Sequence, residues 1–259
     1  MIDAEKIESR IRSSRKYADI HPSVILRQIR QLQGRFDSDK DLEQAVRRKL
    51  HQAFGAYLGG NWLRKLERGI AADTESIRDT CRDLMILHAS TRERLIDLED
   101  VTSAIGDRIS EDSRVVDLAC GLNALTLPWL FDRKRFHYEG VDLHKRMIDA
   151  MGRFANTAVL DANLVWGDVL SESHIKGDVV LMLKLLPCLE HQEEGSATRI
   201  VQQTSADVIV ASFPTRSIGG KSRGMDYTYH RQIEIIADET DRSLERISFE
   251  SETLFVLSR

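Results

Sequence analysis

The sequence has few cysteines and no long apolar run. Its 259 residues include three cysteines, Cys81, Cys120 and Cys188, which stand in unrelated contexts and show no metal-ligand spacing. This pattern argues against a disulfide framework and against a zinc site. No segment approaches the roughly 20 apolar residues of a membrane span, and the first residues lack the features of a signal peptide. We therefore expect a reduced, cytoplasmic protein with no membrane or metal partner.

The G-x-G-x-x-G motif of dinucleotide-binding proteins is also missing. An apolar run at 114–118 leads into a turn that keeps only Gly121, and a second apolar run ends at Asp142, 21 residues further on. A carboxylate at this position binds ribose hydroxyls, but nothing here cradles a pyrophosphate. The pattern favours S-adenosylmethionine over NAD and makes a dehydrogenase a remote alternative. An ordinary turn without a ligand is a further alternative.

The net charge of −4 conceals an asymmetry between the two ends of the chain. Residues 1–70 carry an excess of six basic residues, whereas the remainder carries an excess of ten acidic residues. The basic residues form three clusters: Arg10, Arg12, Arg15 and Lys16; Arg47, Arg48 and Lys49; Arg64, Lys65 and Arg68. Such clusters indicate contacts to the phosphates of a nucleic acid. Solvated helix faces are the alternative interpretation.

Two regions with different periodicity follow one another. Residues 1–105 carry apolar residues at helical spacing, and residues 106–259 alternate strands with helices. We expect five parallel strands at 114–118, 137–142, 162–166, 178–184 and 207–212, a helix at 226–237, and a terminal hairpin at 244–249 and 253–257. This predicts an α/β class I methyltransferase fold, a seven-stranded doubly wound sheet with an all-α N-terminal domain.

Three further features lie where strands of such a sheet end. Asp168 follows the third strand and is placed to accept the adenine amino group. Lys184 ends an apolar strand, where a cation needs solvent or a partner. The segment 212–224 combines one aromatic residue with basic residues and glycines, which suits contact with an extruded base and its flanking phosphates.

Five segments occur in an order and at a spacing that resemble a known family: 88–95, 117–123, 184–187, 195–197 and 212–217. They resemble the aminoglycoside-resistance 16S rRNA methyltransferases, which methylate N7 of a guanine in the decoding site. One departure is Asn123-Ala124, where the family is expected to have Asn-Pro. The resemblance implies S-adenosylmethionine as cofactor and 16S rRNA in the assembled 30S subunit as substrate, with the enzyme acting as a monomer.

The resemblance also implies roles for individual residues. In the cofactor site, Arg94 would hold the methionine carboxylate, Asp142 the ribose, and Asp168 the adenine. The implied cofactor-binding residues are His88, Arg94, Ala119, Gly121, Asp142, Asp168, Val169, Leu183 and Gln192. Apart from the resemblance, we hypothesise that the target guanine flips out, that Phe213 stacks on it, and that Lys184 hydrogen-bonds O6 or a phosphate of the flipped nucleotide. The residues expected to hold rRNA are Arg10, Arg47, Arg48, Lys49, Arg64, Lys65, Arg68, Arg216, Lys221 and Arg223.

Two other functions remain open from the sequence. An enzyme of the same fold can act on another decoding-site atom, such as adenine N1, because the fold does not fix the target. A protein from another class would bind rRNA but keep an idle cofactor pocket.

Overall fold

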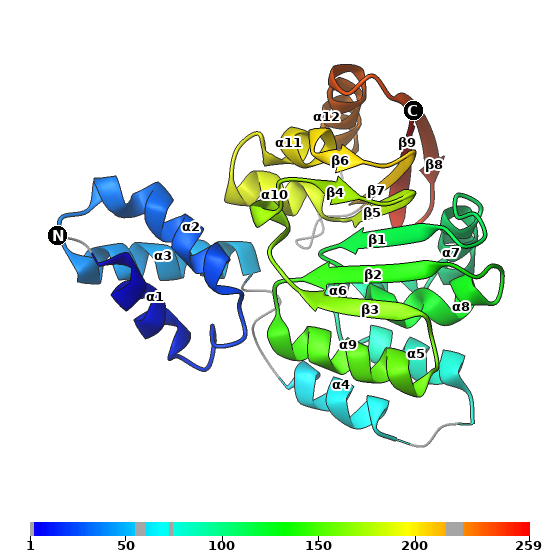
Figure 1. Cartoon of the computed structure of the whole chain (residues 1–259), viewed down its shortest axis with the longest axis horizontal. Helices are drawn as coiled ribbons and strands as arrows, with labels where there is room; N and C mark the ends of the chain where they lie inside the picture. The colour runs from blue at the N-terminus through cyan, green and yellow to red at the C-terminus, as the bar shows by residue number, and fades with distance from the viewer. Residues whose placement is uncertain (1–2, 55–60, 73–74, 216–224) are drawn as a thin grey trace.

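The computed structural model describes residues 3–54, 61–72, 75–215 and 225–259. Its centre is a seven-stranded sheet of order β3-β2-β1-β5-β7-β9-β8 (Figure 1). The strands are β1 (Arg114–Leu118), β2 (His137–Asp142), β3 (Ala162–Trp166), β5 (Val179–Leu183), β7 (Val208–Pro214), β8 (Ser243–Ser248) and β9 (Glu252–Ser258). The first five of these are parallel, and β9 inserts antiparallel between β7 and β8. The predicted fold class is confirmed, including the terminal hairpin.

Side chains on the central strands alternate between two apolar cores, as a pleated sheet requires. On β5, Val179 and Leu181 face one core, whereas Val180 and Met182 face the other. Because both faces are covered, these strands read as continuous apolar runs.

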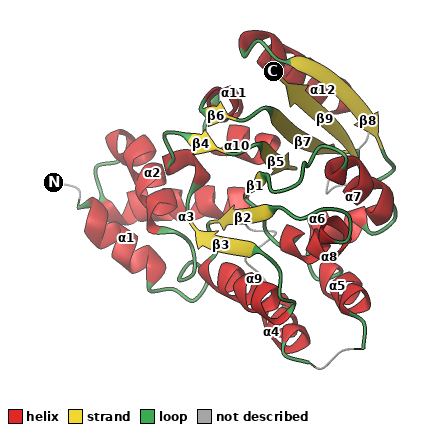
Figure 2. Cartoon of the chain, turned by 45° about the vertical axis from the view of Figure 1, so that its right-hand side comes forward, coloured by secondary structure: helices red, strands yellow, loops and turns green. Residues whose placement is uncertain are grey.

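Helices cover both faces, as Figure 2 shows in a turned view. The first core is closed by α4 (Trp62–Ile70), α5 (Ile77–Met85), α7 (Leu98–Gly106), α8 (Leu127–Phe131) and α9 (Lys145–Thr157). The second core is closed by α10 (Leu186–Gln192), α11 (Ser196–Gln202) and α12 (Met225–Glu239). A small pair, β4 (Ile175–Lys176) and β6 (Thr204–Ser205), which the sequence did not predict, lies outside the main sheet. None of the helices in the described ranges is long and apolar enough to cross a membrane.

The first three helices form a unit with its own core. They are α1 (Ala4–Arg12), α2 (Pro22–Leu32) and α3 (Asp39–Phe54), and their buried residues pack mainly on one another. Figure 1 shows them as a separate group beside the sheet. The domain boundary at residue 105 stays a prediction, although the three helices that share a separate core end at Phe54. Helices α4, α5 and α7 bury their apolar faces against the sheet, although they precede it in sequence.

Candidate active site

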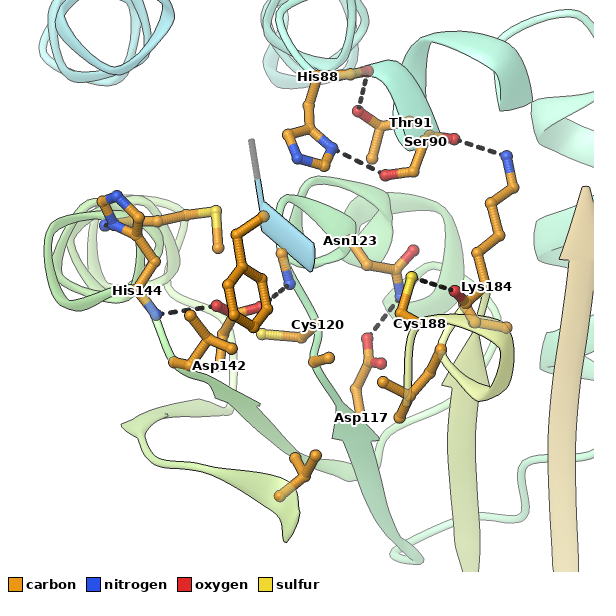
Figure 3. A pocket seen from close by; sticks show the side chains of 18 of the residues that line it. His88, Ser90, Thr91, Asp117, Cys120, Asn123, Asp142, His144, Lys184 and Cys188 are labelled. Atoms are coloured by element: carbon orange, nitrogen blue, oxygen red, sulfur yellow. Dashed lines mark hydrogen bonds between the residues drawn. The ribbon is translucent and has the colours of Figure 1, made fainter. Parts of the chain in front are cut away.

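A pocket opens at the carboxyl ends of β1, β2 and β5, the edge where open α/β sheets bind ligands (Figure 3). The short helix α6 (Ala89–Arg94) and the residue before it, His88, border it on one side, and Ile20 and Phe54 reach it from the N-terminal unit. All the predicted cofactor-binding residues line this one pocket: His88, Arg94, Ala119, Gly121, Asp142, Asp168, Val169, Leu183 and Gln192.

The turn after β1 and the end of β2 build one side of the pocket. Ala119 and Gly121 both have positive φ, 54° and 53°, so the chain reverses tightly after β1. The Gly121 N–H donates to Asp142 Oδ2 at 3.1 Å, and the His144 N–H donates to Asp142 Oδ1 at 3.0 Å. Burial raises the pKa of Asp142 to about 6, against the opposing effect of these amides. The carboxylate is thus fixed in orientation and still lines the pocket.

Asp117 is a site residue that the sequence interpretation missed. It is 1% exposed, and its Oδ2 accepts hydrogen bonds from Asn123 Nδ2 at 2.6 Å and Tyr138 OH at 2.7 Å. Within the described part of the chain, its Oδ1 is buried and accepts no hydrogen bond. Because a buried carboxylate oxygen is costly without a partner, this atom fits the ammonium of a bound amino acid moiety. The sequence feature that could have identified Asp117 is the presence of an acid inside the apolar run at 114–118.

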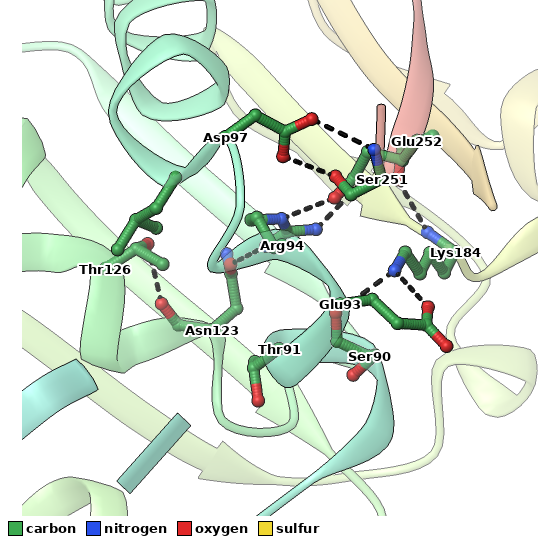
Figure 4. Close-up of polar contacts among 12 residues, drawn as sticks. Ser90, Thr91, Glu93, Arg94, Asp97, Asn123, Thr126, Lys184, Ser251 and Glu252 are labelled. Atoms are coloured by element: carbon green, nitrogen blue, oxygen red, sulfur yellow. Dashed lines mark hydrogen bonds and ion pairs between the residues drawn. The ribbon is translucent and has the colours of Figure 1, made fainter. Parts of the chain in front are cut away.

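Arg94 lies in a buried ion pair (Figure 4). Its Nε and Nη2 contact the two carboxylate oxygens of Glu252 at 2.6 and 2.9 Å, and its Nη1 contacts Asn123 Oδ1 at 2.5 Å. Glu252 comes from β9 and is 0% exposed. Arg94 lines the pocket as predicted, but its guanidinium also ties α6 to the terminal hairpin, a partnership that the sequence did not predict.

Asp168 has an N-terminal partner that the sequence did not predict. It forms an ion pair with Arg27 of α2 and accepts a hydrogen bond from Ser23 Oγ at 2.8 Å. Burial alone would raise the pKa of Asp168, but Arg27 together with the hydrogen bonds from Ser23 and Ser171 outweighs it, and the pKa lies below its ordinary value. Arg27 Nη2 also donates to Gln192 Oε1 at 3.3 Å. Helix α2 therefore approaches the side of the pocket that Asp168 and Gln192 line.

Lys184 and His88 lie at the other side of the pocket. Lys184 has a φ of 55°, which is unusual for a residue other than glycine, and its Nζ contacts Glu93 Oε2 at 2.8 Å. His88 Nδ1 lies 2.8 Å from Ser90 Oγ. Burial, followed by the charges of Lys184 and Arg92, lowers the pKa of His88 to about 4. His88 is therefore neutral at physiological pH and does not add to the positive charge here.

The prediction that Phe213 stacks on the target base does not fit the structure. Phe213 is 2% exposed and packs edge-on against Phe255 with ring centroids 5.5 Å apart. The strand extends beyond the predicted end at 212, so Phe213 points to the same core as Ile209 and Ala211. Ser212 takes the opposite face and accepts a hydrogen bond from the Lys184 N–H at 3.0 Å.

The basic residues predicted to hold RNA fall into three groups. Arg10 and Arg47 both form ion pairs with Glu43, and Arg47 Nη2 also donates to the backbone carbonyl of Arg10 at 2.9 Å. These two side chains hold α1 against α3. The exposed group is Arg48, Lys49, Arg64, Lys65 and Arg68. Arg216, Lys221 and Arg223 lie outside the described residues.

A basic crevice, which was not predicted as one surface, adjoins the cofactor pocket. Arg15 and Lys16 line it from the N-terminal unit, Arg64 from α4, and Arg146 from α9. Trp62 and His144 line both the crevice and the pocket, so the two hollows meet at these residues. Their rings lie 6.1 Å apart between centroids. A polyanion bound in the crevice would therefore lead towards the pocket.

Comparisons with known proteins agree with this geometry. A 16S rRNA (guanine(1405)-N(7))-methyltransferase of Micromonospora echinospora is 32% identical over 98% of this chain and 96% of its own length. One from Proteus mirabilis is 30% identical over 98% of this chain and 97% of its own. The crystal structure of the 16S rRNA methyltransferase RmtF with S-adenosyl-L-homocysteine superposes with a TM-score of 0.85 at 30% identity, covering 100% of both chains.

The family comparison spans nearly the whole chain. The family model described as ribosomal RNA methyltransferase (FmrO) matches residues 12–257, which include α2 and α3 of the N-terminal unit, the pocket and all but the last residue of the terminal hairpin. The chain belongs to the FmrO family of ribosomal RNA methyltransferases.

Proposed function

We propose that this protein methylates N7 of guanine 1405 in 16S rRNA with S-adenosylmethionine, as the names of its relatives state for them. The observation that carries the proposal is the arrangement of acids in the pocket. Asp142 is held by two backbone amides beside the Gly121 turn, and Asp117 presents an oxygen that has no hydrogen-bond partner in the described ranges. These groups suit the ribose hydroxyls and the methionine ammonium of one elongated ligand.

The residues present fit this cofactor along its length. Asp142 binds the ribose, Asp117 the ammonium, and Arg94 faces the methionine carboxylate with the hydrogens that Glu252 and Asn123 leave free. Val169 and Gln192 line the adenine side with Asp168. Asp168 offers its carboxylate to the adenine amino group while it keeps its ion pair with Arg27.

Catalysis in this proposal depends on positioning. Bound S-adenosylmethionine supplies a methyl group that its sulfonium already activates. Guanine N7 has a free lone pair and no proton at neutral pH, so no side chain has to act as a general base. The chain's own residues align the base with the methyl group, which reduces the entropic cost of bringing the two together. Lys184 lies where it can hydrogen-bond the target base.

The substrate is proposed to be the assembled 30S subunit, methylated by a monomeric enzyme in the cytoplasm. A stacked guanine exposes N7 only in the deep RNA groove, so the target base is expected to flip out. The basic crevice and the exposed cations of α3 and α4 support binding to folded rRNA, because they are spread over a surface rather than along one line. The proposal assigns no role to a metal ion.

A resistance assay tests this function in cells. Expression in a sensitive bacterium is expected to give high resistance to gentamicin and kanamycin but not to apramycin or neomycin. Asp142→Ala removes the ribose contact and is expected to abolish the resistance. Resistance that extends to apramycin would favour adenine N1 as the target. No resistance from a folded, expressed protein would contradict the proposal.

A further inference from the structure

An ion pair joins the pocket to the protein surface between β5 and α6. Lys184 follows β5, and its Nζ contacts Glu93 Oε2 at 2.8 Å and the backbone carbonyl of Ser90 at 3.1 Å (Figure 4). The Lys184 side chain is 10% exposed and lines the pocket, whereas the Glu93 side chain is 38% exposed. The two side chains therefore form a polar pair that runs outward from the pocket.

Lys184 and Glu93 do not use all of their hydrogen-bonding groups on each other. An ammonium group carries three donors, and two of those on Lys184 are used by Glu93 and Ser90. Glu93 Oε1 accepts no hydrogen bond from any residue that the structure describes. Among the residues that the structure describes, the third Lys184 donor and Glu93 Oε1 thus have no partner and lie next to each other.

The Watson–Crick edge of guanine carries an acceptor followed by donors, which complements the donor of Lys184 followed by the acceptor of Glu93. From N7 it presents the O6 acceptor, then the N1–H and N2–H donors. We propose, on the basis of the function proposed above, that the Lys184–Glu93 pair selects guanine. Lys184 donates to O6, and Glu93 accepts from N1–H and N2–H. In this order N7 lies next to Lys184 and faces the pocket.

The same pair rejects adenine. Adenine has an amino donor at position 6, which would face the Lys184 ammonium, and an unprotonated N1, which would face the Glu93 carboxylate. A site that hydrogen-bonds one base pays a large penalty with a base that leaves its polar groups unpaired. Glu93 is therefore a specificity residue that touches the base, and Lys184 is its partner.

Removing the N2 amino group of the target base and substituting Glu93, separately and together, tests this assignment. Small subunits are reconstituted with guanine or inosine at position 1405; inosine keeps N7, O6 and N1–H but lacks the N2 amino group. Single-turnover methyl transfer is measured for the wild type, Glu93→Gln, Glu93→Ala and the control Glu99→Gln. Glu99 lies on the nearby α7 and also forms an ion pair, with Arg82 at 2.7 Å.

The wild type and Glu99→Gln are expected to prefer guanine over inosine by at least about fivefold. Glu93→Gln is expected to slow guanine methylation by about tenfold or more and to reduce this preference, and Glu93→Ala to bring it close to one. Binding of S-adenosylmethionine should be unchanged in both variants.

Slower transfer with an unchanged guanine preference in both Glu93 variants would mean that Glu93 only positions Lys184, and would overturn the inference. Unchanged rates, or a wild type that does not distinguish inosine from guanine, would overturn it as well. A wild type that methylates no guanine subunits would instead reject the proposed function and, with it, this inference.

Discussion

At the scale of single residues, the pocket buries two carboxylates, and burial disfavours their charged form. Burial raises the pKa of Asp117 and of Asp142 to about 6. The folded state therefore binds these protons more tightly than the unfolded chain does. Stability from these groups is present at low pH and is lost as the pH rises from about 4 to about 6. Above about pH 6 the two buried charges therefore destabilise the ligand-free protein, and the ammonium of a bound ligand would neutralise the charge of Asp117.

Asp117→Asn tests this balance. The variant removes the buried charge, so we expect the free energy of unfolding of the ligand-free protein to rise by ~1–2 kcal/mol at pH 8 and to be unchanged at pH 4. Binding of S-adenosylmethionine is expected to weaken by about tenfold or more, because the ammonium loses a charged acceptor. Urea unfolding at the two pH values and calorimetry measure both effects.

The control for this experiment is Asp161→Asn, since the Asp161 side chain is 63% exposed and lies away from the pocket. It should change neither quantity. Wild-type affinity for S-adenosylmethionine in Asp117→Asn would show that Asp117 does not hold the ammonium.

At the scale of elements, a buried ion pair ties the terminal hairpin to the site. Glu252 on β9 holds Arg94 at the end of α6, and the two residues are separated by 158 positions in the sequence. Glu252→Ala leaves the Arg94 guanidinium buried without its counter-charge. We expect this to lower the free energy of unfolding by ~3–5 kcal/mol, measured by denaturant unfolding.

Glu245→Ala provides the matched control. Glu245 lies on the adjacent strand β8 and pairs with Arg108 at 2.7 Å, but its side chain is 52% exposed. Its loss should have little effect, because solvent screens exposed pairs. Equal, small effects of both substitutions would contradict a supporting role for the buried pair.

Local sequence patterns predicted the helices and strands better than they predicted which distant segments and side chains pair with one another. The strands β1, β2 and β3 have the predicted bounds because each is an apolar run between turn residues. Phe213 was misplaced because pairing with β9 lengthens β7, and this pairing depends on residues about 40 positions away. The Arg94–Glu252 and Arg27–Asp168 pairs were not predictable for the same reason.

At the scale of the whole molecule, helical periodicity did not reveal whether a helix packs in the N-terminal unit or against the sheet. Helices α1–α3 form their own core, but α4, α5 and α7 complete the core of the sheet. Polar contacts that cross the junction include Arg27 with Asp168, Gln31 with Glu193 at 3.2 Å, and a β-bridge between Ile20 and His144. The N-terminal unit is thus attached beside the cofactor pocket.

Charge reversal on this unit tests its part in binding rRNA. Arg48→Glu combined with Lys49→Glu changes two exposed cations of α3 and is expected to weaken binding to 30S subunits. The slope of log affinity against log salt should fall by about one for each phosphate that the variant no longer neutralises. Filter binding at several salt concentrations measures this, while calorimetry should show unchanged binding of S-adenosylmethionine.

A double variant of equal charge is the control. Arg135→Glu with Lys176→Glu changes two exposed cations that precede β2 and β5, at the edge of the sheet opposite the pocket. Equal reductions of affinity in both double variants would indicate a general effect of net charge rather than a docking surface on α3.

The most direct test of the central claim is the position of the transferred methyl group. Purified protein is incubated with 30S subunits and S-adenosylmethionine, and the 16S rRNA is then cleaved chemically at N7-methylguanine and read by primer extension. We predict one new stop, at guanine 1405, that is absent without the cofactor and absent with Asp142→Ala. Methylation at another base, or no methylation by protein that binds the cofactor, would contradict the account.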